Sequence, residues 1–145
     1  MMTCHDVAKY FLALMNEEAG DLISNMKLQK LVYYAQGFHQ AIFEKPLFEA
    51  DIEAWTHGPV IPELYDEYRK YDSLPLPKPD DMDYSVYDKD VRELLDEVYA
   101  VFGQFSAWKL MNMTHEESPW RDTPPSSVIS CDSMNEYFKT QLCSE

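Results

Sequence analysis

The sequence feature that most constrains the fold is the stretch from residue 26 to residue 43, MKLQKLVYYAQGFHQAIF. Its apolar residues recur at steps of three, four and seven, which places them on one face of an α-helix. They are Leu28, Leu31, Val32, Ala35 and Ile42. Tyr33 and Gly37 lie on the opposite face, so both sides of the helix must be covered. The sequence therefore predicts a central buried helix over residues 25–43.

Gly37 adds a second expectation for this helix. Inside a helix, glycine costs about 1 kcal/mol relative to alanine. A glycine is retained at such a position where a neighbour comes too close for a methyl group. We expect another backbone to pass Gly37 at short distance.

Periodicity and capping residues predict further helices around the central one. They cover residues 3–18, 59–71, 91–105, 107–113 and 132–142. Extended segments near residues 52–55 and 128–130 predict a small two-stranded β element. Residues 72–83 contain three prolines at alternate positions and predict an exposed loop rather than a domain boundary. The expected fold is a mainly α, compact single domain, 1–145, with about six helices.

Composition narrows the classes of partner. The 145 residues include 12 basic and 26 acidic side chains, for a net charge of -14. Such a charge repels nucleic acids and anionic membranes, so we expect no direct contact with either. A strongly acidic surface favours basic partners, or serves only solubility.

The ends and the cysteines of the chain indicate its compartment. The chain has no apolar run long enough to span a membrane, and its first residues lack the pattern of a signal peptide. Cys4, Cys131 and Cys143 are odd in number and widely separated, which predicts reduced thiols rather than a disulfide framework. We expect a cytoplasmic protein.

Several motifs in order carry a family resemblance. They are MKLQKLVYYAQGF (26–38), KPLF (45–48), IEAW (52–55), HGPVIPELY (57–65), TH (114–115), PWR (119–121), and Met134 with YF (137–138). With these motifs, residues 5–140 resemble the Panacea domain, a family of SocA-like antitoxins and GepA-like phage-associated proteins. The resemblance implies an antitoxin that neutralises a cognate toxin by direct contact. It also implies two routes, occlusion of the toxin or its delivery to a ClpXP-type protease.

The motifs supply candidate residues of two kinds. Five polar residues of the central helix are candidates for binding the partner, and the polar tips of Lys27 and Tyr34, which flank the apolar stripe, could instead bond neighbouring loops. The five are Lys27, Lys30, Tyr33, Tyr34 and Gln36. The other motif residues are expected to be structural: His39, Trp55, His57, Gly58, Pro59, Thr114, His115, Trp120 and Arg121. Trp108 is expected to be a core or loop anchor, and Arg121 a tether paired with a carboxylate.

There are two alternatives to an antitoxin, namely an enzyme and an acidic protein that mimics a nucleic acid. Histidines 39, 57 and 115, with carboxylates at positions 53, 63, 116 and 117, could form an acid–base pair or a metal site in an enzyme. Yet the chain has no His-x-x-x-His, His-Glu-x-x-His or Gly-x-Ser-x-Gly motif, so we expect no catalytic residue, metal or cofactor. In the second alternative, surface carboxylates imitate the phosphates of a nucleic acid and block a protein that binds DNA. This would require a linear array of carboxylates at the spacing of phosphates.

Overall fold

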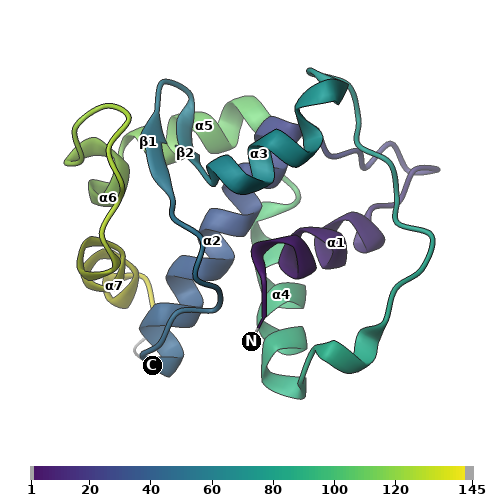
Figure 1. Ribbon diagram of the computed structural model, residues 1–145, viewed down its shortest axis with the longest axis horizontal. Coiled ribbons are helices and arrows are strands. Elements are labelled where there is room, and N and C mark those ends of the chain that lie inside the picture. Colours follow the sequence, from purple (N-terminus) through teal and green to yellow (C-terminus); the bar gives the residue numbers. More distant parts are fainter. Residues whose placement is uncertain (1, 143–145) are drawn as a thin grey trace.

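The computed structural model describes residues 2–142, most of which are helical (Figure 1). The α-helices are α1 (Cys4–Leu14), α2 (Asn25–Phe43), α3 (Pro62–Tyr68), α4 (Lys89–Phe102), α5 (Ala107–His115), α6 (Ser118–Arg121) and α7 (Cys131–Thr140). Two strands, β1 (Glu53–Trp55) and β2 (Gly58–Val60), and two 3-10 turns, η1 (Arg69–Tyr71) and η2 (Tyr84–Val86), complete the described elements. The mainly α fold with a small two-stranded element is confirmed. Cys143 lies outside the described residues.

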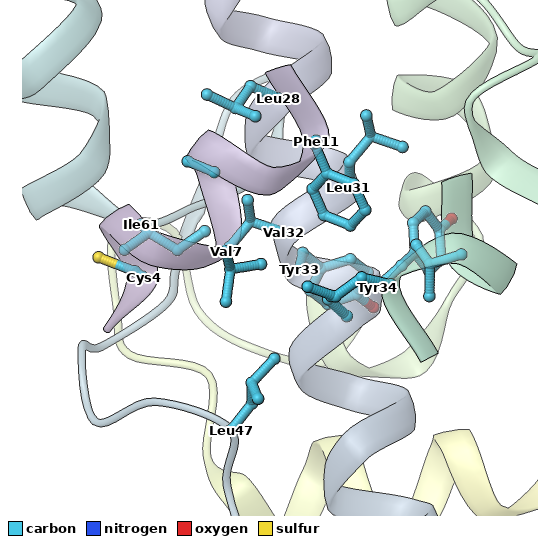
Figure 2. Close-up of a cluster of buried hydrophobic side chains, with 14 of the residues drawn as sticks. Cys4, Val7, Phe11, Leu28, Leu31, Val32, Tyr33, Tyr34, Leu47 and Ile61 are labelled. Atoms are coloured by element: carbon cyan, nitrogen blue, oxygen red, sulfur yellow. The ribbon is translucent and has the colours of Figure 1, made fainter. Parts of the chain in front are cut away.

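Helix α2 is central, and both of its faces are covered. It packs against α1, α3, α4, α5, α7 and β2. Leu28, Leu31 and Val32 are buried among side chains of α1, and Tyr33 is buried too (Figure 2). The prediction of a buried helix over residues 25–43 is confirmed. Ile42 is the exception, because it is 46% exposed in the last turn of α2.

Capping side chains set where the helices begin. Thr3 and Asp6 form a capping box at the start of α1, as the sequence predicts. Ser106 caps α5, also as expected, whereas α7 is capped by Ser130 rather than Asp132. Helix α1 ends at Leu14, earlier than predicted, because the chain then enters a turn.

The β element is built differently from the prediction. Strands β1 and β2 form an antiparallel hairpin in which Glu53 pairs with Val60, while the expected partner segment contributes a single bridge from Val128 to Glu53. Residues 58–60 are therefore a strand and not the start of a helix. The chain stays extended because the Ile61 N–H donates to a Gln29 side-chain oxygen at 2.9 Å. Helix α3 then begins at Pro62, whose missing N–H costs nothing at that position.

The structure corrects two smaller expectations, one for Gly37 and one for the loop of residues 72–83. Gly37 lies against the ring of Phe138 in α7, so an aromatic side chain rather than a backbone excludes a methyl group there. Residues 72–83 form an irregular connection, as predicted, but Leu76 is buried and its N–H donates to the Ile23 carbonyl at 2.8 Å. This connection is therefore tied to the chain just before α2.

Within residues 2–142, every helix is too short or too polar to cross a bilayer.

Candidate functional site

Polar side chains on the buried surface of α2 hold the loops around it. Gln29 accepts the Ile61 N–H, as described above, and Gln36 accepts the N–H of Leu47 at 2.7 Å. The Nδ1 atom of His39 lies 2.8 Å from the Lys45 carbonyl. Lys27 donates its Nζ to the Gly103 carbonyl at 2.7 Å, at the end of α4. These residues meet the hydrogen-bonding needs of buried backbone groups.

Tyr33 and Tyr34 serve one buried carboxylate. Their hydroxyls donate to the two oxygens of Glu117, at 2.9 Å and 2.7 Å. Burial raises the pKa of Glu117 to about 7, and the tyrosine hydrogen bonds oppose that rise by stabilising the charged form. Glu117 is thus a buried acid with both oxygens hydrogen-bonded.

Lys30 is buried in a different way. Its Nζ donates to the Pro59 carbonyl at 3.4 Å, and within residues 2–142 it forms no ion pair. Burial lowers the pKa of Lys30 to about 7. The hairpin closes over this side chain at Gly58, where a β-carbon would collide with Lys30 and Thr114. The φ angle of Gly58 is 113°, which also favours glycine.

A cleft of about 870 Å³ opens beside Lys30. It lies at the N-terminal end of α2 and is lined by residues of the β1–β2 hairpin, α3 and the start of α5, which Figure 1 shows gathered at that end of α2. Trp108, the second residue of α5, is 69% exposed on its rim. The volume is within the usual range of ligand pockets.

The remaining motif residues support the hairpin and α6. The Trp120 indole donates to the Trp55 carbonyl at 2.7 Å, and the ring of His115 stacks on Trp120 with centroids 4.0 Å apart. Thr114 is buried and donates its hydroxyl to the Met111 carbonyl at 2.8 Å. These contacts agree with a structural role for the Thr-His and Pro-Trp-Arg motifs.

Arg121 and His57 lie at the surface. Arg121 pairs with the carboxylate of the adjacent Asp122 at 3.1 Å and donates to the Glu116 carbonyl at 3.3 Å. The expected carboxylate partner is therefore local, and the pair is exposed to solvent. His57 is exposed in the hairpin turn and lines the cleft.

The five residues predicted to bind the partner differ in whether they reach the cleft. All five are buried, and of these only Lys30 lines the cleft. The prediction for Trp108 is wrong, because Trp108 is exposed rather than anchored in the core. The pattern of α5 contained a signal for this, since its buried residues Leu110, Met111 and Thr114 share a face from which Trp108 points away.

One group of side chains could hold a metal ion. Ligand atoms of Cys4, His5 and Glu63 lie within 4.8 Å of one another, with His5 Nε2 2.9 Å from Glu63 Oε2. Burial raises the pKa of the Cys4 thiol to about 12, which disfavours the thiolate that binds metals. This group could not be predicted from the sequence, because Glu63 lies 59 positions from Cys4 and 58 from His5.

Comparisons with known proteins identify the family of this chain. The family model described as "Antitoxin SocA-like, Panacea domain" matches residues 28–121, from α2 through α6. Antitoxin SocA of Caulobacter vibrioides (strain NA1000 / CB15N) is 32% identical over 109 residues, which is 68% of this chain. The chain spans 58% of the length of that relative. No solved structure matches significantly.

Proposed function

Because the chain belongs to the SocA-like Panacea family, we propose that it is an antitoxin that neutralises a cognate toxin by binding it directly. The observation that carries this proposal is the similarity to Antitoxin SocA, which covers 68% of the chain. The cleft beside α2 gives the proposal a physical basis, since it combines a hollow surface with an exposed tryptophan. This is a binding role and requires no chemistry.

The charge of the chain suggests the kind of toxin. With a net charge of -14, it would attract a toxin with a basic surface and accelerate the encounter. The association rate constant should therefore fall several-fold between low and physiological ionic strength, because salt screens exposed charges. A rate constant that does not change with salt would remove electrostatic attraction from the proposal.

Growth assays test the proposed function directly. Each protein encoded beside this chain's gene is expressed alone and together with the chain. We expect at least one product to stop growth alone, to be neutralised by the chain and to co-purify with it. If the chain neutralises none of them, the proposal fails.

The route of neutralisation can be separated in the same assay. Delivery to a ClpXP-type protease requires that rescue be lost in cells without that protease, and that the toxin level fall when the chain is expressed. Occlusion requires rescue without the protease and at an unchanged toxin level. Both routes begin with the same contact between the two proteins.

A further inference from the structure

The amine of Lys30 has hydrogen-bonding capacity that the fold leaves unused. An ammonium group has three N–H donors, and the bond that Lys30 makes within residues 2–142 is the long one to Pro59, at 3.4 Å. Lys30 is 1% exposed, so solvent does little to compensate. A buried ammonium without a counter-ion is unfavourable, and an anion beside it relieves that cost.

The cleft is electrostatically different from the rest of the protein. Its lining includes Lys30 and Arg69 but one acidic residue, Asp72, although the chain has 26 acidic side chains. The first residues of α2 also line it, and the N-terminus of a 19-residue helix carries a partial positive charge. The charge of the cleft is therefore suited to a negative group.

The walls of the cleft add an apolar, aromatic surface. Both Trp108 and Trp55 line the cleft; Trp108 is exposed, and Trp55 makes an edge-to-face contact with Tyr65, at 5.1 Å between centroids. Exposed tryptophan is unusual on a protein surface and is enriched at the centres of protein interfaces. An occupant of this cleft should carry an apolar side chain next to its negative group.

We propose that this cleft binds a segment of the toxin in which a carboxylate pairs with the Lys30 amine and a neighbouring apolar side chain packs on Trp108. Because Lys30 is 1% exposed beneath Gly58, this pairing requires a small shift of the hairpin or of the lysine side chain toward the cleft. The identity of the partner rests on the proposed function, whereas the chemistry of the segment rests on the cleft itself. The acidic exterior attracts a basic protein, and the cleft accepts one acidic residue or the C-terminal carboxylate of that protein.

Two small peptides test the chemistry without the toxin. Ac-Leu-Phe-Glu-NH2 and Ac-Leu-Phe-Gln-NH2 have the same size and apolar content and differ in the carboxylate. Binding is followed by the NMR signal of the Trp108 indole N–H, at about pH 6, where Lys30 carries most of its charge. We expect the Glu peptide to bind at least about fivefold more tightly, and this preference to disappear in Lys30→Met.

Three results with these probes would overturn the inference. Equal affinity for the two peptides would show that the carboxylate is not recognised. A preference that persists in Lys30→Met would show that Lys30 is not the contact. AMP serves as a competing probe, because it joins a negative phosphate to a flat aromatic base that can stack on tryptophan. Tighter binding of AMP than of the Glu peptide, or no response of Trp108 at peptide concentrations up to about 5 mM, would exclude this occupant.

The toxin itself provides the second test. Lys30→Met and Trp108→Ala should each weaken toxin binding at least about tenfold, whereas the matched variants Lys27→Met and Ile42→Ala, outside the cleft, should bind as wild type. Thermal unfolding of each variant verifies its fold, and Trp108 is too exposed for its loss to unfold the protein. If the wild-type chain neutralises a toxin and Lys30→Met does so equally well, the inference fails and the proposed function stands. If the chain neutralises no toxin, the proposed function fails, and the peptides alone decide the chemistry of the cleft.

Discussion

The residues around Glu117 and those around Lys30 differ in how completely the fold satisfies a buried ionisable group. Glu117 accepts two tyrosine hydroxyl bonds, at 2.9 Å and 2.7 Å. Lys30 donates one bond of 3.4 Å and has no ion pair within residues 2–142. Burial moves the pKa of each group to about 7, upward for the acid and downward for the amine. One group is internally satisfied, and the other retains free donors beside a cleft.

This difference separates stabilising residues from binding residues on one helix. Tyr33 and Tyr34 come from α2, as does Lys30, and all three are almost completely buried. Burial alone would assign them the same role. Their hydrogen bonds assign the tyrosines to the core and leave Lys30 as the candidate for contact with a partner.

The largest effect on stability should follow from removing tyrosine hydroxyls that donate to Glu117. In the double variant Tyr33→Phe/Tyr34→Phe, the Glu117 carboxylate remains buried and loses the two hydroxyls that donate to it from α2, so that of these tyrosines only Tyr137, in α7, still faces it. We expect unfolding free energy to fall by about 3–5 kcal/mol at pH 8. The loss should be smaller at pH 5, where Glu117 is protonated in the folded state. Urea unfolding at the two pH values measures both.

Tyr68→Phe is the matched control for that variant. Tyr68 is partly buried, and its hydroxyl donates no hydrogen bond within residues 2–142. Its loss should change the unfolding free energy by less than about 0.5 kcal/mol. An equally small effect in the double variant would contradict the account of Glu117.

Replacing Lys30 should instead increase the free energy of unfolding. Lys30→Met removes a buried amine and should raise the unfolding free energy by about 1–3 kcal/mol at pH 6. Because the pKa of Lys30 is lowered to about 7 in the folded state, the cost of burying its charge is full below about pH 7 and absent above its ordinary value of 10.5. The gain should therefore shrink as pH rises through that window, which urea unfolding at pH 6, 8 and 10 measures.

Lys27→Met sharpens this comparison within the same helix. Lys27 is also buried but donates a 2.7 Å bond to the Gly103 carbonyl. Its replacement leaves that carbonyl without its partner and should cost about 1–2 kcal/mol. Destabilisation by both lysine variants would show that Lys30 is a structural residue like Lys27.

The smallest effect on stability is expected at the rim of the cleft. Trp108→Ala removes a large side chain that is 69% exposed. The melting temperature should shift by no more than about 2–3 °C, because little buried surface is lost. A large drop, measured by circular dichroism, would place Trp108 in the folding core and remove it from the binding surface.

The sequence predicted the fold better than the site, for physical reasons. Helix α2 could be predicted because a period of 3.6 residues is local information, and so could the Thr3 capping box. The exposure of Ile42 could not, because periodicity gives the direction of a side chain but not where the neighbouring elements end. The segment 58–60 depends on Gln29, 32 positions from the Ile61 N–H that it holds, so local reasoning misplaced a helix there.

The cleft was beyond prediction for the same reason. Its walls come from α2, the hairpin, α3 and α5, which only the tertiary fold brings together. The sequence could place Lys30 among the candidate polar residues of the central helix, but the hydrogen bonds that distinguish Lys30 from Tyr33 and Tyr34 require coordinates. The exposure of Trp108, by contrast, could be predicted from the helical face that Leu110, Met111 and Thr114 define.

A pH titration of the Lys30 and Glu117 side chains by ¹³C NMR tests the central claim most directly. In the free protein, the account predicts that the Lys30 pKa is about 7 and the Glu117 pKa is about 7. Saturation with Ac-Leu-Phe-Glu-NH2 should raise the Lys30 pKa, because a carboxylate favours the ammonium form, and leave Glu117 unchanged. A Lys30 pKa near its ordinary value of 10.5 in the free protein, or equal shifts of both groups on binding, would contradict the account.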